Sequence, residues 1–308
     1  MIARQPLVVP FTKMHGAGND FVVLDNRFLH FTADELGEIA RRVCARRTAV
    51  GADGLLALDP PGTPPEAGAS GDGSASPQTD FRMRYRNADG SLGTMCGNGA
   101  RCLARFAARA GLGRAAEDGT THLAFGTDGG RYTARVTPER PGPPEASGGD
   151  AGAAPRVTLD VPPPRAWETP EAASPLGAVH PIWTGTEHTV LLVESADDAP
   201  VAEEGARLRA HSAFAPTGTN VNFVQATGPG AVRARTFEKG VEAETLACGT
   251  GALAAALVAH REGAVRGDAV RVEMPGGTLV VGLGASGGPL TLGGPAEIAY
   301  EGTLEWWG

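Results

Sequence analysis

The sequence has few cysteines, a deficit of positive charge and no long apolar run, and each shortage excludes a class of protein. Four cysteines in 308 residues, none in a Cys-x-x-Cys pair, are too sparse for a disulfide framework. A total of 27 Lys and Arg against 35 Asp and Glu disfavours nucleic acid and anionic lipid as partners. The sequence contains no run of about 18 apolar residues, which a membrane-spanning helix would need, and no signal peptide is evident. We therefore expect a cytoplasmic protein with reduced thiols that binds a small molecule.

The motifs of common cofactor enzymes are also missing. There is no P-loop, no Gly-x-Gly-x-x-Gly after a predicted strand and no His/Cys cluster at zinc spacing, so we expect neither a cofactor nor a metal ion. Glycine and proline are abundant, at 44 and 24 residues, which predicts short strands, tight turns and few helices. Two Pro/Gly-rich segments, 60–77 and 138–155, are expected to be flexible surface excursions.

Periodicity and start signals predict the secondary structure. The strand candidates are 21–24, 81–86, 157–161, 189–193, 221–224, 232–237, 270–272, 279–283 and a last strand at 297–306. One helix is predicted from Thr32 to about residue 46, because Thr32 and Glu35 have the spacing of a capping box. Two more helices are predicted to begin after Cys96 and after Cys248.

These last two helices belong to a degenerate internal repeat. RMRYRNADGSLGTMCGNGARCLARF, from Arg82, and RARTFEKGVEAETLACGTGALAAAL, from Arg233, follow one plan. Each has an alternating strand, a polar loop, Cys-Gly-x-Gly and an apolar helix. Two such half-molecules facing each other would place Cys96 and Cys248 at related positions.

A cysteine at a helix start has a chemical use. The first turn of a helix presents unpaired N–H groups and a positive dipole end, which favour a thiolate and can bind a substrate carboxylate. Two such starts around one substrate suit inversion at an amino-acid α-carbon, in which one thiolate removes the proton and the opposite thiol supplies another. By contrast, Cys44 and Cys102 are interpreted as packing residues. A disulfide between Cys96 and Cys248 would be an inactivated form.

In these motifs and in several others, the chain resembles the diaminopimelate epimerase family. FTKMHGAGNDFVVLDN, VGADGLLAL, NADGSLGTMCGNGARC, GTNVNFV, ETLACGTGA and MPGGTL occur in the family's order. The resemblance implies an α+β (α/β) fold of two pseudo-symmetric halves, each a mostly antiparallel sheet wrapped around a central helix. It also implies a homodimer, an active site where the two halves meet, and a role in lysine biosynthesis.

The resemblance assigns catalytic and binding roles to the residues of this chain that match the family's motifs. Cys96 and Cys248 match the two acid/base cysteines, acting on the L and D centres respectively, and His188 and Glu238 match the pair that assists them. The substrate-binding residues implied by the resemblance are Asn19, Asn87, Gly97, Asn98, Asn220, Glu238, Lys239, Gly249 and Thr250. Of these, Gly97-Asn98 and Gly249-Thr250 match backbone donors to the reacting carboxylate, and the others match contacts to the rest of the substrate.

Two departures fall on recognition of the substrate's far end. Thr186 stands where the family usually has asparagine, and Lys239 stands where it has arginine, which loses a bidentate fork. Asn87, Asn220 and Glu238 are retained and favour a zwitterionic far end, so we predict interconversion of LL- and meso-diaminopimelate. The alternative is racemisation of histidine, lysine or glutamate by the same two thiols.

The expected N-terminal half is 1–125, with the C-terminal strand 297–308 returning to it, and the expected C-terminal half is 126–296.

The sequence favours an epimerase or racemase over two other classes of function. A non-enzymatic carboxylate-binding protein would not need both cysteines, and a thiol-disulfide oxidoreductase would need a local Cys-x-x-Cys.

Overall fold

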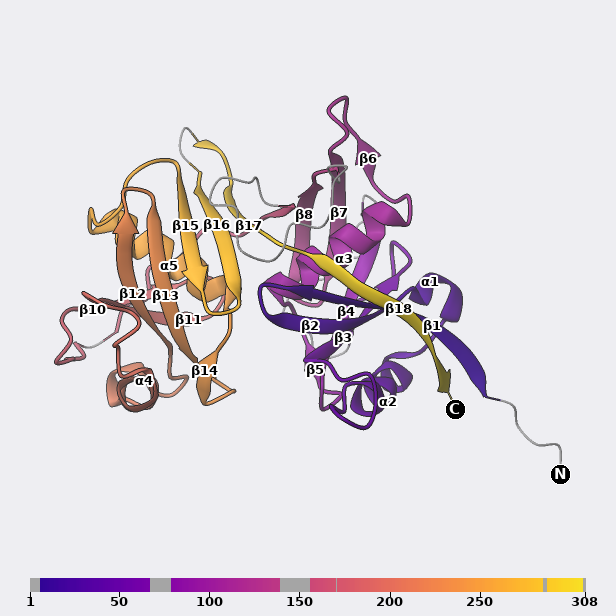
Figure 1. Ribbon diagram of the computed structural model, residues 1–308, viewed down its shortest axis with the longest axis horizontal. Helices are drawn as coiled ribbons and strands as arrows, with labels where there is room; N and C mark the ends of the chain where they lie inside the picture. The colour runs from indigo at the N-terminus through magenta and orange to yellow at the C-terminus, as the bar shows by residue number, and fades with distance from the viewer. Residues whose placement is uncertain (1–5, 67–78, 139–155, 170, 285–286, 307–308) are drawn as a thin grey trace. The chain divides into compact units, whose positions relative to one another are not determined.

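A computed structural model describes residues 6–66, 79–138, 156–169, 171–284 and 287–306 (Figure 1). The chain divides into two units, and each is described by itself. The first unit takes its described residues from Met1–Gly142, Arg156–Leu159 and Pro295–Gly308, and the second from Pro143–Pro155 and Asp160–Gly294. The boundary expected near Gly126 falls inside β7 (Thr121–Thr127), because β7 forms a hairpin with β8 (Gly130–Val136) in the first unit.

One mixed sheet forms the first unit. Its strand order is β18 (Glu297–Trp306), β1 (Leu7–Gly16), β2 (Asn19–Leu24), β3 (Gly54–Asp59), β4 (Phe81–Asn87), β7 and β8. The short strands β5 (Leu92–Gly93) and β6 (Arg114–Ala115) pair with β4 and β7, and β9 is Val157–Asp160. The helices are α1 (Asn26–Leu29), α2 (Ala33–Val43) and α3 (Gly97–Arg109).

The sheet of the first unit wraps around α3. This helix packs against β1, β2, β3, β4, β7 and β8, and the side chains of Ala100, Cys102, Leu103 and Ala107 are buried there. The opposite face of the sheet is covered by α2, whose Leu36, Ile39 and Ala40 lie in a cluster with Trp306. Burial of the apolar stripe of each helix therefore forms two layers of core.

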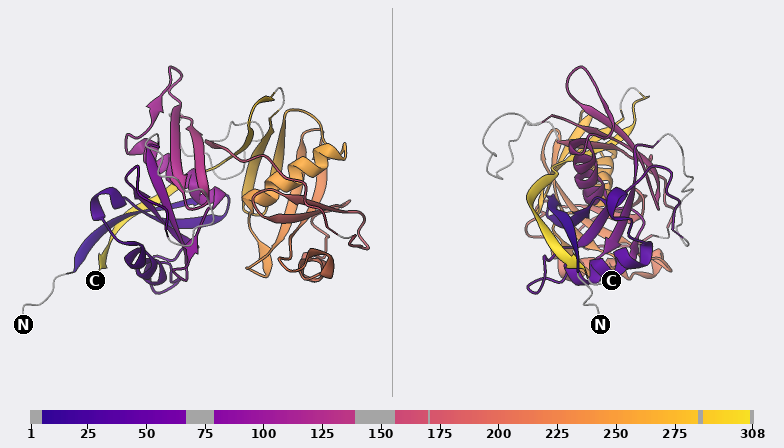
Figure 2. Two further views of the ribbon diagram at one scale, coloured as in Figure 1. Left: turned by 180° about the vertical axis from the view of Figure 1, so that it is seen from behind. Right: turned by 90° about the vertical axis from the view of Figure 1, so that its right-hand side faces the viewer.

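A second sheet follows the same plan. Its order is β10 (Val179–Trp183), β11 (Glu187–Leu192), β12 (Asn220–Gly228), β13 (Ala231–Glu238), β15 (Ala269–Met274), β16 (Gly277–Leu283) and β17 (Leu290–Gly294). β14 (Ala243–Thr245) pairs with β13, and the helices are α4 (Val201–Arg209), the short 3-10 helix η1 (Ser212–Phe214) and α5 (Gly249–Arg261). Seen from behind, α5 lies across the face of this sheet (Figure 2).

The internal repeat is confirmed by strand pairing. From β1 to β8 the successive neighbours pair antiparallel, parallel, antiparallel, parallel and antiparallel, and the same sequence of pairings runs from β10 to β16. The predicted fold of two pseudo-symmetric halves, each a mostly antiparallel sheet around one helix, is therefore correct.

Local signals explain which elements were predictable. The capping box of Thr32 and Glu35 starts α2 as expected, with both reciprocal hydrogen bonds present. The helix α4 was missed because its N-cap, Pro200, makes no side-chain cap bond and Gly205 interrupts its pattern. A Cβ at Gly205 would lie 2.6 Å from the Cβ of Phe237, so glycine permits the close approach of α4 to β13.

Part of the first Pro/Gly-rich excursion lies within the described residues. Its described portion, 60–66, ends at Glu66, whose carboxylate pairs with Arg84 at 2.7 Å and also with Arg86. The rest of that excursion, and 139–155 of the second, lie outside the described residues. Within the described ranges, none of the helices combines the length and apolar character needed to cross a membrane.

Candidate active site

The two predicted catalytic cysteines occupy equivalent backbone positions. Cys96 is the N-cap of α3 and Cys248 is the N-cap of α5, both in extended conformation, with φ and ψ of -138° and 118° and of -124° and 113°. The Sγ of Cys96 accepts from the N–H of Gly99 at 3.5 Å, and that of Cys248 accepts from Gly251 at 3.4 Å. Donation from a helix N-terminus favours a negative charge on sulfur. Each unit thus presents one thiol suited to proton transfer.

The first turn beyond each cysteine offers further donors. The first backbone hydrogen bonds of the helices run from Ala100 to Cys96 and from Ala252 to Cys248, both at 2.8 Å. The N–H groups of the two residues that directly follow each cysteine therefore precede the helical ladder and can donate to an anion. These residues are Gly97, Asn98, Gly249 and Thr250. A carboxylate is the substrate group that this arrangement favours.

A chain of side chains supports the first cysteine turn. Asn98 donates through Nδ2 to Oδ1 of Asn19 at 2.5 Å, and Asn19 donates in turn to Asp53 at 3.0 Å. Arg101, on the next turn of α3, donates to Oδ1 of Asn98 at 2.6 Å. The structure therefore joins two predicted site residues, Asn19 and Asn98, and adds Arg101, which the sequence analysis missed.

A different set of side chains supports the second cysteine turn. The hydroxyl of Thr250 lies 3.4 Å from Sγ of Cys248 and 2.9 Å from Nε2 of His188. The other ring nitrogen of His188, Nδ1, lies 3.1 Å from Nδ2 of Asn222. Oδ1 of Asn222 accepts from Thr236 at 2.9 Å, which fixes the amide with its nitrogen toward the ring. Nδ1 is thus an acceptor, and the ring proton is on Nε2.

This tautomer defines what His188 can do. Its Nε2–H donates to Thr250, so the hydroxyl of Thr250 keeps a proton that it can donate to Cys248 when that sulfur is a thiolate. Burial lowers the pKa of the fully enclosed His188 to about 3, assisted by the positive charge of Lys239. His188 is therefore neutral at physiological pH and acts as a donor to Thr250 rather than as a cationic acid. Asn222 was also missed by the sequence analysis, although it lies only two positions after Asn220.

Glu238 lies at the end of β13, apart from this relay. Its carboxylate accepts from the hydroxyl of Thr245 at 2.8 Å, and no hydrogen bond joins it to His188 in the described residues. Burial raises the pKa of Glu238, although the hydroxyl of Thr245 acts in the opposite direction. The predicted assisting residues His188 and Glu238 thus have separate hydrogen-bond partners, Thr250 and Asn222 for His188 and Thr245 for Glu238.

Lys239 and Thr186, the two departures from the family pattern, both contact the carboxylate of Glu187. Nζ of Lys239 lies 2.6 Å from Oε2 of Glu187, and the hydroxyl of Thr186 donates to the same oxygen at 2.9 Å. Burial opposes the effect, but the hydrogen bond from Lys239 lowers the pKa of Glu187. Asn220 closes this cluster by accepting from the backbone N–H of Lys239 and donating to the backbone of Glu187. Glu187 therefore partly neutralises Lys239.

The last residues singled out by the sequence are Cys44, Cys102 and Asn87. Cys44 and Cys102 are buried as predicted, and desolvation raises the pKa of each thiol to about 12. Asn87, at the end of β4, donates to the hydroxyl of Ser91 at 2.9 Å in an exposed turn. Asn87 and Glu238 thus end equivalent strands, as the repeat predicted.

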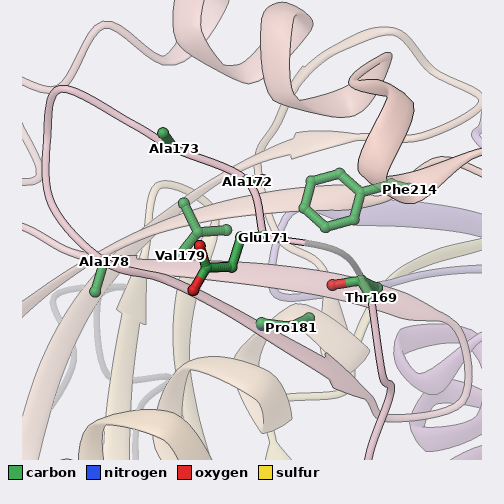
Figure 3. Close-up of a pocket in the computed structure, with 8 residues that line it drawn as sticks. All are labelled: Thr169, Glu171, Ala172, Ala173, Ala178, Val179, Pro181 and Phe214. Atoms are coloured by element: carbon green, nitrogen blue, oxygen red, sulfur yellow. The ribbon is translucent and has the colours of Figure 1, made fainter.

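A cavity of about 490 Å³ lies elsewhere in the second unit (Figure 3). It is lined by Glu171, Val179, Pro181 and Phe214 among others, and none of its lining residues is a predicted site residue. Across the described ranges, no group of three or more His, Cys, Asp or Glu side chains could hold a metal ion.

The sequence of this chain matches that of known proteins. The family model for diaminopimelate epimerase matches residues 11–144 and 182–298. A diaminopimelate epimerase from Chlorobaculum tepidum is 39% identical over 292 residues, covering 94% of this chain and 99% of that protein.

Solved structures of lower identity share the fold. A PhzF-family phenazine biosynthesis protein from Bacillus anthracis matches with a TM-score of 0.63 at 15% identity, covering 97% of this chain and 99% of its own. A hydroxyproline epimerase from Agrobacterium vitis matches with a TM-score of 0.60 at 16% identity, covering 97% and 92%. The family match and the curated relative together show that this chain belongs to the diaminopimelate epimerase family.

Proposed function

We propose that the protein is an epimerase that interconverts LL- and meso-diaminopimelate, the step that the family contributes to lysine biosynthesis. Family membership and the relative that bears this name support the substrate. The observation that carries the reaction type is the matched pair of N-cap thiols, Cys96 and Cys248, each followed by two N–H groups free of the helical ladder.

In the proposed reaction the thiolate of one cysteine removes the α-proton and becomes a thiol. The electron pair of the broken C–H bond is delocalised into the adjacent carboxylate, where backbone N–H donors stabilise the added charge. The thiol of the other cysteine then protonates the opposite face of the carbon and becomes the thiolate. The net result is inversion with no change in the total number of protons on the enzyme.

The second unit contributes more than a sulfur atom. The hydroxyl of Thr250, held by the neutral ring of His188, donates to Cys248 and stabilises it while it carries charge. Glu238, Asn87, Asn220 and Asn19 are proposed to contact the amino and distal groups of the substrate. For Asn19 and Asn220 this requires sharing carboxamide groups that already bind protein partners.

A racemase of another amino acid is the second candidate, and one observation favours it for a substrate without a distal carboxylate, such as histidine or lysine. Lys239, proposed to bind the distal carboxylate, is paired with Glu187. A distal carboxylate must compete with Glu187 for this ammonium, whereas a substrate without that group need not. The 39% identity to a diaminopimelate epimerase over nearly the full length favours the first candidate.

The test is solvent deuterium incorporation at the α-carbon, measured by mass spectrometry with reduced protein and no added cofactor. LL-diaminopimelate, L-histidine, L-lysine and L-glutamate are incubated separately. We expect exchange in diaminopimelate alone. Exchange confined to another amino acid would establish the second candidate, and exchange in none of them would reject diaminopimelate and these three amino acids as substrates.

We also propose that the enzyme is a cytoplasmic homodimer, as family membership suggests. A reducing compartment maintains the two thiols that the chemistry needs. Sedimentation velocity of the reduced protein measures the subunit number, and a monomer at assay concentration would contradict the dimer.

A further inference from the structure

The feature that the proposed reaction does not explain is a buried cation behind the first cysteine turn. Arg101 is 0% exposed and is the largest fully buried side chain of the described residues. Its guanidinium donates to Oδ1 of Asn98 at 2.6 Å, to the carbonyl of Pro295 at 3.3 Å and to the carbonyl of Gly97 at 3.4 Å. All three acceptors are neutral.

Arg101 has no direct counter-ion in the part of the chain that the structure describes, since none of the ion pairs there includes it. The carboxylate reached through hydrogen bonds is Asp53, which is separated from Arg101 by Asn98 and Asn19 and is already paired with Arg46. Burial of an unpaired cation is strongly unfavourable unless an anion lies nearby.

Among the described titratable groups that act on Arg101, one can supply the balancing negative charge. Desolvation lowers the pKa of Arg101 to about 10, so it remains charged at neutral pH. Cys102 follows it on α3, but burial raises the pKa of that thiol to about 12 and keeps it protonated. Arg105 and Glu297, which also face Cys102, pair with each other at 2.7 Å. Cys96 remains, because its negative form interacts favourably with Arg101.

In the second unit, the position equivalent to Arg101 holds no cation. Leu253 stands five positions after Cys248, as Arg101 stands five positions after Cys96, and it is buried and apolar. The side chain that supports the second cysteine turn is instead His188, which is neutral. The two thiols therefore occupy equivalent backbone positions in different electrostatic surroundings.

We propose that Arg101 is a positioning residue that fixes the Gly97–Asn98 turn and biases the resting enzyme toward a Cys96 thiolate and a Cys248 thiol. This assignment deepens the proposed function and rests on it. It implies that the resting enzyme is poised to remove a proton with Cys96, and that a substrate carboxylate held by the Gly97–Asn98 turn also benefits from the buried charge.

The test measures both thiols in one molecule. The full-length protein is alkylated with iodoacetamide across a pH series, and the rates at Cys96 and Cys248 are read separately by peptide mass spectrometry. In the unmodified sequence we expect the midpoint for Cys96 to lie below that for Cys248. In Arg101→Met we expect the Cys96 midpoint to rise by about one pH unit or more, with the Cys248 midpoint unchanged.

Two variants keep the inference falsifiable. Arg101→Lys retains the charge but not the fork, so it should hold the Cys96 midpoint while raising KM several-fold with a smaller change in kcat. Arg109→Met removes a cation from the same helix that is 55% exposed at its side chain, and it should change neither midpoint. A folded Arg101→Met protein with an unshifted Cys96 midpoint, or with both midpoints shifted equally, would overturn the proposal.

The outcome is separable from that of the proposed function. Absence of deuterium exchange into every amino acid would reject the epimerase. Alkylation midpoints need no substrate, so they test the effect of Arg101 on the Cys96 thiolate whatever the exchange assay shows.

Discussion

The neutral, buried His188 predicts a specific dependence of stability on pH. The folded pKa is about 3, below the ordinary value of 6.5, so the unfolded chain binds a proton that the folded protein rejects. A depressed histidine pKa contributes stability that is complete above the unfolded pKa. That stability is lost as pH falls from 6.5 toward the folded value.

The magnitude follows from linkage. Each pH unit inside this window costs about 1.4 kcal/mol, so lowering the pH from about 7 to about 4.5 should reduce the free energy of unfolding by about 2.5 kcal/mol through this residue. Other groups titrate in the same range. Burial also lowers the pKa of His180, and burial raises the pKa of Glu238, which acts in the opposite direction. Their effects cancel when a variant is compared with the parent protein.

The assay is urea denaturation at several pH values for the parent protein and for His188→Gln, which cannot titrate. The variant is expected to be less stable at neutral pH, because the contacts of His188 with Thr250 and Asn222 are altered. The informative quantity is the slope, and the stability difference between the two proteins should shrink by about 2.5 kcal/mol between about pH 7 and about pH 4.5. Parallel curves would refute the assignment of a neutral, buried ring.

Three other outcomes test the site. Cys96→Ser should reduce exchange from the L centre, and Cys248→Ser from the D centre, each by at least about 100-fold, as deuterium incorporation into each stereoisomer would report; normal turnover by both would contradict the two-thiol reaction. Thr250→Val should lower the free energy of unfolding by about 1–3 kcal/mol, because the ring N–H loses its acceptor, whereas Thr250→Ser should retain most of it; equal stability of the two variants in urea would argue against the relay. Glu187→Gln should free Lys239 and lower KM for diaminopimelate several-fold with kcat nearly unchanged; a raised KM in steady-state assays would mean that the pair itself binds substrate.

The sequence predicted those parts of the fold that depend on neighbours along the chain. The capping box of Thr32 and Glu35 and the N-cap positions of Cys96 and Cys248 all involve residues three positions apart or fewer. Such contacts recur wherever the local pattern recurs, which is why the repeat could be recognised and why its two helices begin where predicted. In contrast, β3 was missed because all six of its residues are buried, so it shows no alternation of apolar and polar positions.

The side chains that contact each cysteine turn could not be predicted from local sequence patterns. His188 meets Thr250 across 62 positions and Asn222 across 34, and the contact of Arg101 with Pro295 spans 194. A pattern of residue types gives no register between such distant strands, so Arg101 and Asn222 were overlooked although both lie within recognised motifs. The same applies to Glu187, whose pairing with Lys239 depends on β11 and β13 both neighbouring β12.

The sequence by itself thus determined the chemistry that two equivalent local motifs can supply, because a cysteine at a helix start acquires its donors from its own helix. Only the tertiary structure decided how the two motifs differ. Burial placed an arginine that joins none of the ion pairs of the described residues behind one thiol and a neutral histidine behind the other, and the charge state of a buried group is set by everything packed around it.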